Sequence, residues 1–112
     1  MSVLHELESV FSSASFRQQV GETLAGESLG LFREGLKDND AFIRESCRIM
    51  AQALRDKALG ELDEEDVTVA IAGQKALLQI QLTNAEIATR TRMQNIVDKL
   101  ITLSLATLIH AL

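Results

Sequence analysis

Apolar residues recur at helical spacing along the chain and divide it into four segments. In the first segment, Val3, Leu7 and Val10 fall on one face of a helix that we predict over about 2–12. Residues 12–15, Ser-Ser-Ala-Ser, follow it, and serine side chains compete with the backbone for helical hydrogen bonds. The pattern therefore predicts a break after the first helix.

The second segment, about 16–37, combines an apolar stripe with several glycines. Ser15 and Gln18 have the spacing of a capping box, which predicts that a helix begins there. Each glycine inside a helix costs up to about 1 kcal/mol relative to alanine. Two interpretations stay open: the helix is interrupted near Gly26, which we favour, or the glycines let another helix approach closely. The glycines concerned are Gly21, Gly26, Gly30 and Gly35.

The third segment predicts a helix over about 41–59. Asp40 ends an Asp-Asn-Asp turn and is a suitable N-cap residue. Gly60 is placed to end the helix with a C-terminal glycine cap. The predicted buried ridge, at steps of four, three and four, comprises Ile43, Cys47, Met50 and Leu54.

The fourth segment, 63–112, contains no proline and a single glycine, Gly73. Asp63 is a candidate N-cap, and the three acidic residues after it suit the positive end of a helix dipole. An unbroken helix of this length would extend roughly 70 Å at about 1.5 Å per residue. Because one small domain cannot cover that length, we expect a long C-terminal helix that buries itself against other helices. The chain could instead fold back at a turn near Thr83 and Asn84 or near 89–91, but no glycine or proline marks either point.

The apolar stripe of this expected helix predicts its contacts. The stripe follows steps of three and four with an 11-residue period, and residues 100–112 are apolar on almost every face. The predicted oligomer interface comprises Ile71, Leu78, Leu82, Met93, Ile96, Leu100, Leu103, Leu105, Leu108 and Ile109. A neighbouring line of uncharged polar residues would either hydrogen-bond across the interface or form a solvated flank of the helix; it comprises Gln81, Asn84, Thr91 and Asn95.

These segments predict an all-α fold. Short N-terminal helices, in a region over 1–62, pack on a long C-terminal oligomerisation helix over 63–112, and the two form a single domain. Oligomerisation would complete the helical bundle. The composition favours helices as well, because the chain has no proline, tryptophan or tyrosine and only four phenylalanines.

The charge distribution limits the choice of partner. The net charge of −5 opposes nucleic-acid binding, which needs a basic face. Residues 1–66 hold 14 acidic and 7 basic residues, a net of −7, whereas 67–112 hold 2 and 4, a net of +2. The opposite charges of the two halves could assist head-to-tail association, but we favour ordinary solubility as the explanation of the acidic surface. Arg44, Arg48 and Arg55 form a basic ridge that is more typical of a solvated face than of a binding site.

No set of residues predicts a reaction, a cofactor or a metal site. His5 and His110 lie at opposite ends of the chain, with no serine or carboxylate at catalytic spacing. Cys47 lies on an apolar ridge, where cysteine behaves as a small hydrophobe. Helix capping explains the acids of 61–66, and a divalent-cation site is the weaker alternative.

The N-terminal residues carry acids where a cleaved signal would have a basic start and an apolar run. No stretch reaches the roughly 18 apolar residues of a membrane-spanning helix. We expect a cytoplasmic protein, or one incorporated without a cleaved signal into a virion or a cell-surface assembly.

Together these features favour a non-enzymatic structural or scaffolding subunit of a helical homo-oligomeric assembly, either virion- or prophage-associated or a bacterial assembly factor. The expected partner is a second copy or an obligate protein partner. An alternative is a small acidic regulator or inhibitor that binds its partner through 1–66.

Residues 76–100, ALLQIQLTNAEIATRTRMQNIVDKL, resemble the C-terminal helix of flagellar rod-junction and type III secretion inner-rod proteins. The resemblance covers about a quarter of the chain and includes no diagnostic motif. It implies an export-apparatus or rod-type component that polymerises through its C-terminal helix. The apolar residues after Leu103 depart from that pattern.

Overall fold

The computed structural model describes residues 2–112, of which 86% are helical and none lies in a strand. The all-α prediction is therefore confirmed. The first five helices are α1 (Val3–Phe11), α2 (Ala14–Val20), α3 (Glu22–Leu36), α4 (Ala41–Ala58) and α5 (Glu64–Asn84). The rest is one continuous helix, here called the C-terminal helix, in which α-helical and π-helical stretches alternate. It comprises α6 (Ile87–Arg92), η1 (Met93–Asp98), α7 (Lys99–Leu103), η2 (Ser104–Leu108) and α8 (Ile109–Ala111).

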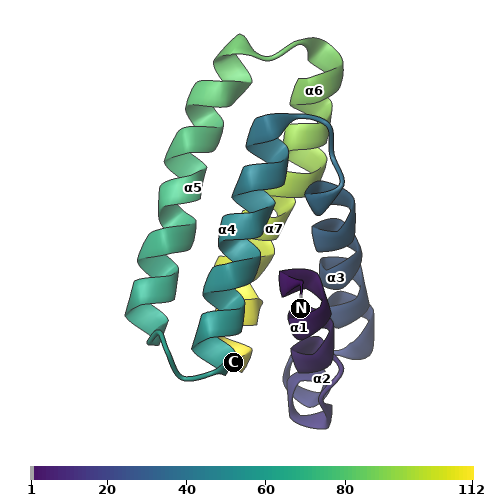
Figure 1. Cartoon of the computed structure of the whole chain (residues 1–112), viewed down its shortest axis with the longest axis vertical. Coiled ribbons are helices and arrows are strands. Elements are labelled where there is room, and N and C mark those ends of the chain that lie inside the picture. The colour runs from purple at the N-terminus through teal and green to yellow at the C-terminus, as the bar shows by residue number, and fades with distance from the viewer. Residues whose placement is uncertain (1) are drawn as a thin grey trace.

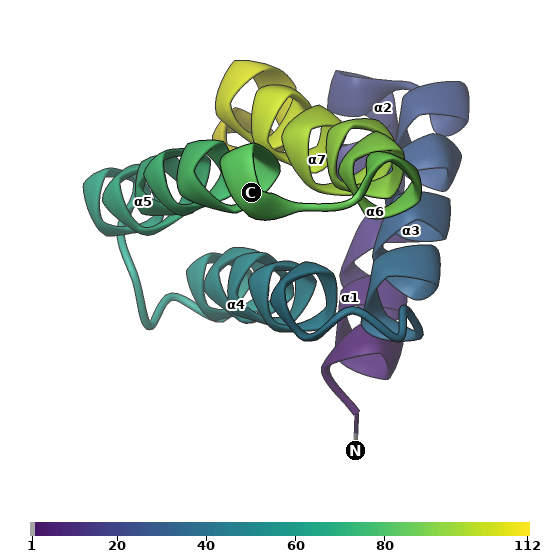
Figure 2. The same cartoon turned by 90° about the horizontal axis from the view of Figure 1, so that it is seen from above.

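Three of these helices, α4, α5 and the C-terminal helix, run side by side, with α5 antiparallel to the other two (Figure 1). The helices α1 and α3 pack on the side of α4 that faces away from α5, and α3 also contacts the C-terminal helix. The short helix α2 packs against α1, α3 and the end of the C-terminal helix. Figure 2 places α5 at one edge of the molecule, beside α4 and the C-terminal helix. The radius of gyration is 13.3 Å, close to the value of about 13 Å for a compact domain of this length.

The N-terminal helix boundaries depend on serine and glycine. Ser2 caps α1, and the Ser13 hydroxyl, not that of Ser15, accepts the Phe16 N–H at 3.3 Å and caps α2. The interruption of the second segment falls at Gly21, whose φ of +91° favours glycine, and not near Gly26. Gly26 lies inside α3. The predicted interruption is correct in kind, but its position is wrong.

The two ends of α4 match the sequence prediction. Asp40 Oδ1 accepts the Ile43 N–H at 2.9 Å, as an N-cap does. At the other end Gly60 has a φ of +79°. The N–H groups of Gly60 and Glu61 donate to the carbonyls of Lys57 and Asp56, which is a Schellman motif.

The predicted start of α5 is also confirmed, because Asp63 Oδ1 accepts the Asp66 N–H at 2.8 Å. We expect Asp63→Ala to lower the free energy of unfolding by about 0.5–2 kcal/mol, because the N–H of the first turn loses its acceptor. Chemical denaturation measures the change. Glu65→Ala, which removes an exposed acid of the same turn, is the control. An equal loss in both variants would show that general charge at the helix start, and not the cap, is responsible.

The prediction of one unbroken helix over 63–112 is wrong. α5 ends at Asn84, and Ala85 and Glu86 adopt extended backbone with ψ of 148° and 157°. The chain then reverses, and the C-terminal helix returns beside α5 (Figure 1). Residues 76–100 therefore span a turn and do not form the single terminal helix that the resemblance to rod proteins implies.

Side-chain hydrogen bonds cover backbone carbonyls at the end of α5, where no glycine or proline is present. Thr83 and Asn84 turn their side chains back to the carbonyls of Gln79 and Ile80, at 3.1 and 3.5 Å. The Arg90 guanidinium donates to the carbonyls of Leu82 and Ala85, both at 3.1 Å. Arginine thus satisfies carbonyls that a glycine cap would otherwise satisfy.

The reversal lets the two halves of the predicted stripe cover each other within one chain. Of the predicted interface residues, the structure buries Ile71, Leu78, Met93, Ile96, Leu100, Leu108 and Ile109. Three others are partly buried against the same core, namely Leu82, Leu103 and Leu105. The predicted polar line, Gln81, Asn84, Thr91 and Asn95, is exposed. The buried residues of the stripe are therefore covered within one chain.

Candidate interaction surface

The outward side of α5 carries large apolar residues in water. Val69 is 66% exposed, Ile80 is 59% exposed and Leu77 is 47% exposed. Gly73 and Ala76, between them, are also exposed. We call these five residues the α5 outer face.

This face arises because α5 has apolar residues on both sides. The buried residues Val67, Ile71 and Leu78 precede the exposed residues Val69, Gly73 and Ile80 by two positions, which places the two sets about 200° apart around the helix. Between Val67 and Asn84 the only charged residue is Lys75, which lies off this face. A helix at the edge of a globule normally presents charged residues to solvent.

Polar groups border the outer face at its two ends. Glu65 and Asp66 lie at its start, exposed, and take part in no ion pair within residues 2–112. At its end lie Thr83 and Asn84, beside the Arg90 guanidinium that caps α5. Ile87, just past the turn, is 79% exposed. An apolar patch with a polar border is typical of a protein–protein contact.

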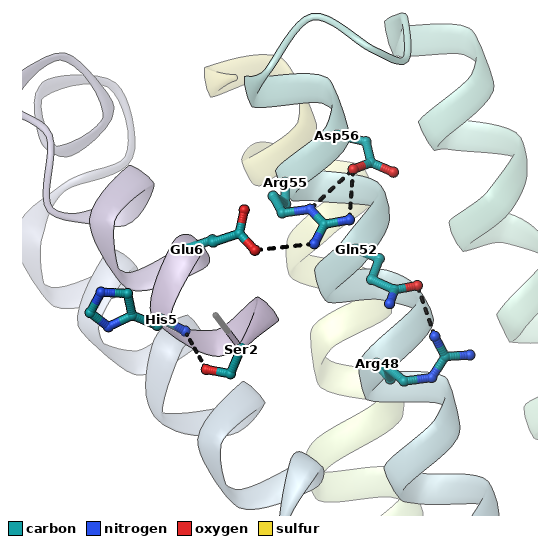
Figure 3. A network of polar contacts seen from close by, with 7 residues as sticks. All are labelled: Ser2, His5, Glu6, Arg48, Gln52, Arg55 and Asp56. Atoms are coloured by element: carbon teal, nitrogen blue, oxygen red, sulfur yellow. Dashed lines mark hydrogen bonds and ion pairs between the residues drawn. The ribbon is translucent and has the colours of Figure 1, made fainter.

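The second candidate site is a shallow hollow of about 230 Å³ between α1 and α4, lined by His5, Glu6, Ser9, Val10, Arg55 and Leu59. Figure 3 shows its polar network. Arg55 donates to Glu6 Oε1 at 3.3 Å and to Asp56 Oδ1 at 3.0 and 3.1 Å. The hydrogen bond to Asp56 and the two nearby carboxylates hold the pKa of Arg55 above its ordinary value, despite partial desolvation. The charge of Arg55 is thus neutralised inside the fold.

The rest of the predicted basic ridge is engaged in the same way. Arg44 donates to the carbonyl of Asp38 at 2.9 Å. Arg48 donates to Gln52 Oε1 at 2.8 Å and pairs with Glu45 (Figure 3 shows the contact with Gln52). Because each guanidinium has acceptors within the chain, the ridge is a poor receptor for phosphates or an acidic partner.

Cys47 and the two histidines, which were the candidates for catalysis or metal binding, lie on three different helices: His5 on α1, Cys47 on α4 and His110 on α8. Cys47 lies fully buried in the core, and burial raises the pKa of its thiol to about 12, so that the thiol is protonated at neutral pH. His110 Nδ1 lies 2.9 Å from Glu64 Oε1, and Lys57 Nζ donates to the Ile109 carbonyl at 2.7 Å. These contacts fasten the end of the C-terminal helix to α4 and α5. Within residues 2–112 no three His, Cys, Asp or Glu side chains converge as metal ligands would.

The most buried carboxylate in an ion pair is Asp38, which joins the α3–α4 turn to the C-terminal helix. Arg92 Nε and Nη2 lie 3.0 and 3.3 Å from its two oxygens. Burial acts to raise the pKa of Asp38, but the hydrogen bonds from Arg92 and the backbone of Asp40, together with nearby arginine charge, hold it below its ordinary value. The stabilisation from this pair is therefore present above the ordinary carboxylate range and is lost as the pH falls through the lowered pKa.

We expect Arg92→Met to lower the free energy of unfolding at pH 7 by about 1.5–3 kcal/mol. The difference in unfolding free energy between the variant and the native chain should narrow as the pH falls through the lowered pKa of Asp38, where its carboxylate takes up a proton. Urea denaturation at several pH values measures both effects. Lys99→Met is the control: Lys99 pairs with Glu27 at an exposed position, and this loss should stay below about 1 kcal/mol. A gap for Arg92→Met that is independent of pH would contradict the assignment to Asp38.

The apolar stripe of 63–112 predicted contacts through the opposite side of α5 and not through the α5 outer face. The signal was present, since Val69, Leu77 and Ile80 are apolar residues in a stretch almost free of charge. The stripe that continues through the whole of 63–112 instead passes through Ile71 and Leu78, on the opposite side of α5.

Comparison of the chain with protein-family models, curated proteins and solved structures gives no significant match. Within residues 2–112, none of the helices combines the length and the apolar character that a membrane crossing requires.

Proposed function

We propose that this protein is a non-enzymatic subunit of a homo-oligomeric helical assembly and that it associates through the α5 outer face. The observation that carries the proposal is the exposure of Val69, Leu77 and Ile80 on one uncharged side of one helix. Burial of such side chains against a second protein contributes about 25 cal/mol per Å² of apolar surface removed from water.

The state of the core supports the choice of this surface. Leu100 and Leu108, which were expected at the interface, are fully buried in a single chain. Association therefore need not complete the fold, and it takes place between subunits that are already folded. The shallow hollow between α1 and α4 is less suitable for association, because Arg55 in it is already paired with Glu6 and Asp56.

We expect Ile80→Asp to reduce self-association at least tenfold while leaving the helix content unchanged, because the carboxylate is fully hydrated in the monomer and loses that hydration in a contact. Light scattering on eluted fractions gives the molar mass of each variant at equal concentration, and circular dichroism gives the helix content.

Leu59→Asp is the matched control. Leu59 is another exposed large apolar residue, at 58%, but it lies at the end of α4 and off the outer face. Its replacement should leave the molar mass unchanged. If both variants dissociate equally, the loss is a general effect of the added charge and gives no support to a contact through the α5 outer face. If the native chain is monomeric at every concentration and binds a different protein through the same face, it is a partner-binding regulator and not an assembly subunit.

A further inference from the structure

The geometry points to one arrangement of the contact: α5 packs antiparallel against α5 of a second copy of this chain, with a two-fold axis between Gly73 and Ala76. This inference rests on the proposed function and adds the identity of the occupant and its orientation.

The spacing on the outer face suits a pair of helices. Val69, Gly73, Ala76 and Ile80 follow steps of four, three and four, as contact positions do along packed helices. The two small residues occupy the middle, and their lack of bulk lets two backbones approach closely. Space around Gly73 is open within the chain, with no atom within 4 Å of an added Cβ. In an antiparallel pair, Val69 lies against Ile80 of the second copy, and Gly73 lies against Ala76 of the second copy.

Charge selects the antiparallel orientation. The start of the outer face carries Glu65 and Asp66, which form no ion pair within residues 2–112, whereas its end carries both the Arg90 guanidinium and Glu86. An antiparallel pair keeps the acidic starts of the two copies apart, brings each start near Arg90 of the other copy and aligns the helix dipoles favourably. A parallel pair would set the acids of both copies against each other, which opposes association.

Size sets the strength of the contact. α5 has 21 residues and is about 30 Å long, and one helix per subunit gives an interface at the small end of the specific range. We therefore expect a dimer that forms and dissociates with concentration. A larger assembly would need a second surface.

Engineered cysteines test the orientation directly. One preparation carries Val69→Cys, and a second carries Ile80→Cys and an affinity tag that changes its mass. The native Cys47 is retained, since its buried thiol does not react, and the native chain is the blank. Each variant is oxidised alone and as an equal mixture at a concentration where the native chain is dimeric, and the products are separated on a non-reducing gel.

We expect a disulfide-linked dimer of mixed mass in the mixture and little product from either variant alone. Self-linked dimers from each variant alone would overturn the antiparallel arrangement while leaving the proposed function intact. No cross-link in any sample, with a native molar mass that still doubles, would place the contact away from α5 and overturn the inference. A native chain that stays monomeric at every concentration would refute the proposed function as well.

Discussion

Replacing Leu100 and Leu108 together with aspartate is expected to unfold the chain. Both side chains are completely inaccessible to solvent in the core between the C-terminal helix and its neighbours. An unpaired carboxylate cannot be hydrated there, and removing a buried leucine costs about 2–5 kcal/mol even without the charge. The cost of losing two buried leucines, together with the cost of burying two carboxylates, is comparable to the whole stability of a typical domain, about 5–15 kcal/mol. Circular dichroism should show loss of most of the helix signal.

The matched double variant Val69→Asp/Ile80→Asp places the same charges on the α5 outer face, where both positions are more than half exposed. It should retain its helix content and lose only self-association. If the Leu100→Asp/Leu108→Asp variant folded as a monomer, these leucines would belong to a contact between subunits and not to the core of one chain.

The second large effect is expected at Gly35, where α3 meets α4. A Cβ added there would overlap Cys47 Sγ and lie 3.1 Å from Ile96 Cγ2. Gly35→Ala should therefore lower the free energy of unfolding by about 1–3 kcal/mol, although alanine is the better helix former. Thermal or urea denaturation measures the change.

Two further variants show whether the close approach is the cause. Gly26→Ala, in the same helix but with no atom within 4 Å of the new Cβ, should instead stabilise the protein by up to about 1 kcal/mol. Adding Cys47→Ala to Gly35→Ala should recover part of the loss, because the overlapping sulfur is gone. If the two effects were simply additive, crowding between these residues would not explain the cost.

The parts of the fold that were predicted depend on local chemistry. Asp40 and Asp63 cap the helices that follow them, and Gly60 ends α4 with the expected positive φ. In each case the residue and the group it bonds lie within a few positions of each other, so the sequence pattern contains the interaction. The alternative interpretation, that the glycines let another helix approach closely, holds at Gly35. There, close packing against Cys47 leaves no room for a side chain.

Local signals near Thr83 and Asn84 allow a reversal after Asn84 but do not favour it over a continuous helix. No glycine or proline is present, and the carbonyls at the end of α5 are satisfied by Arg90, which comes only after the turn. The turn is favoured because it allows apolar residues such as Ile71 and Leu100 to bury in one core, and such tertiary burial outweighs helix propensity. A strong apolar stripe indicates that a helix face is covered without indicating whether the same chain covers it.

The same limit explains the missed surface. Because one chain covers the stripe through Ile71 and Leu78, the face that stays exposed is the less apolar one, with Gly73 and Ala76 at its centre. Only the packing of α5 at the edge of the molecule distinguishes the two faces (Figure 2).

Sedimentation equilibrium of the native chain over a wide range of concentration tests self-association most directly. One chain has a mass of 12.3 kDa. We expect the apparent mass to equal that value in dilute solution and to rise toward twice that value as the concentration increases. A mass that stays at the value of one chain up to the highest soluble concentration would contradict self-association through the α5 outer face.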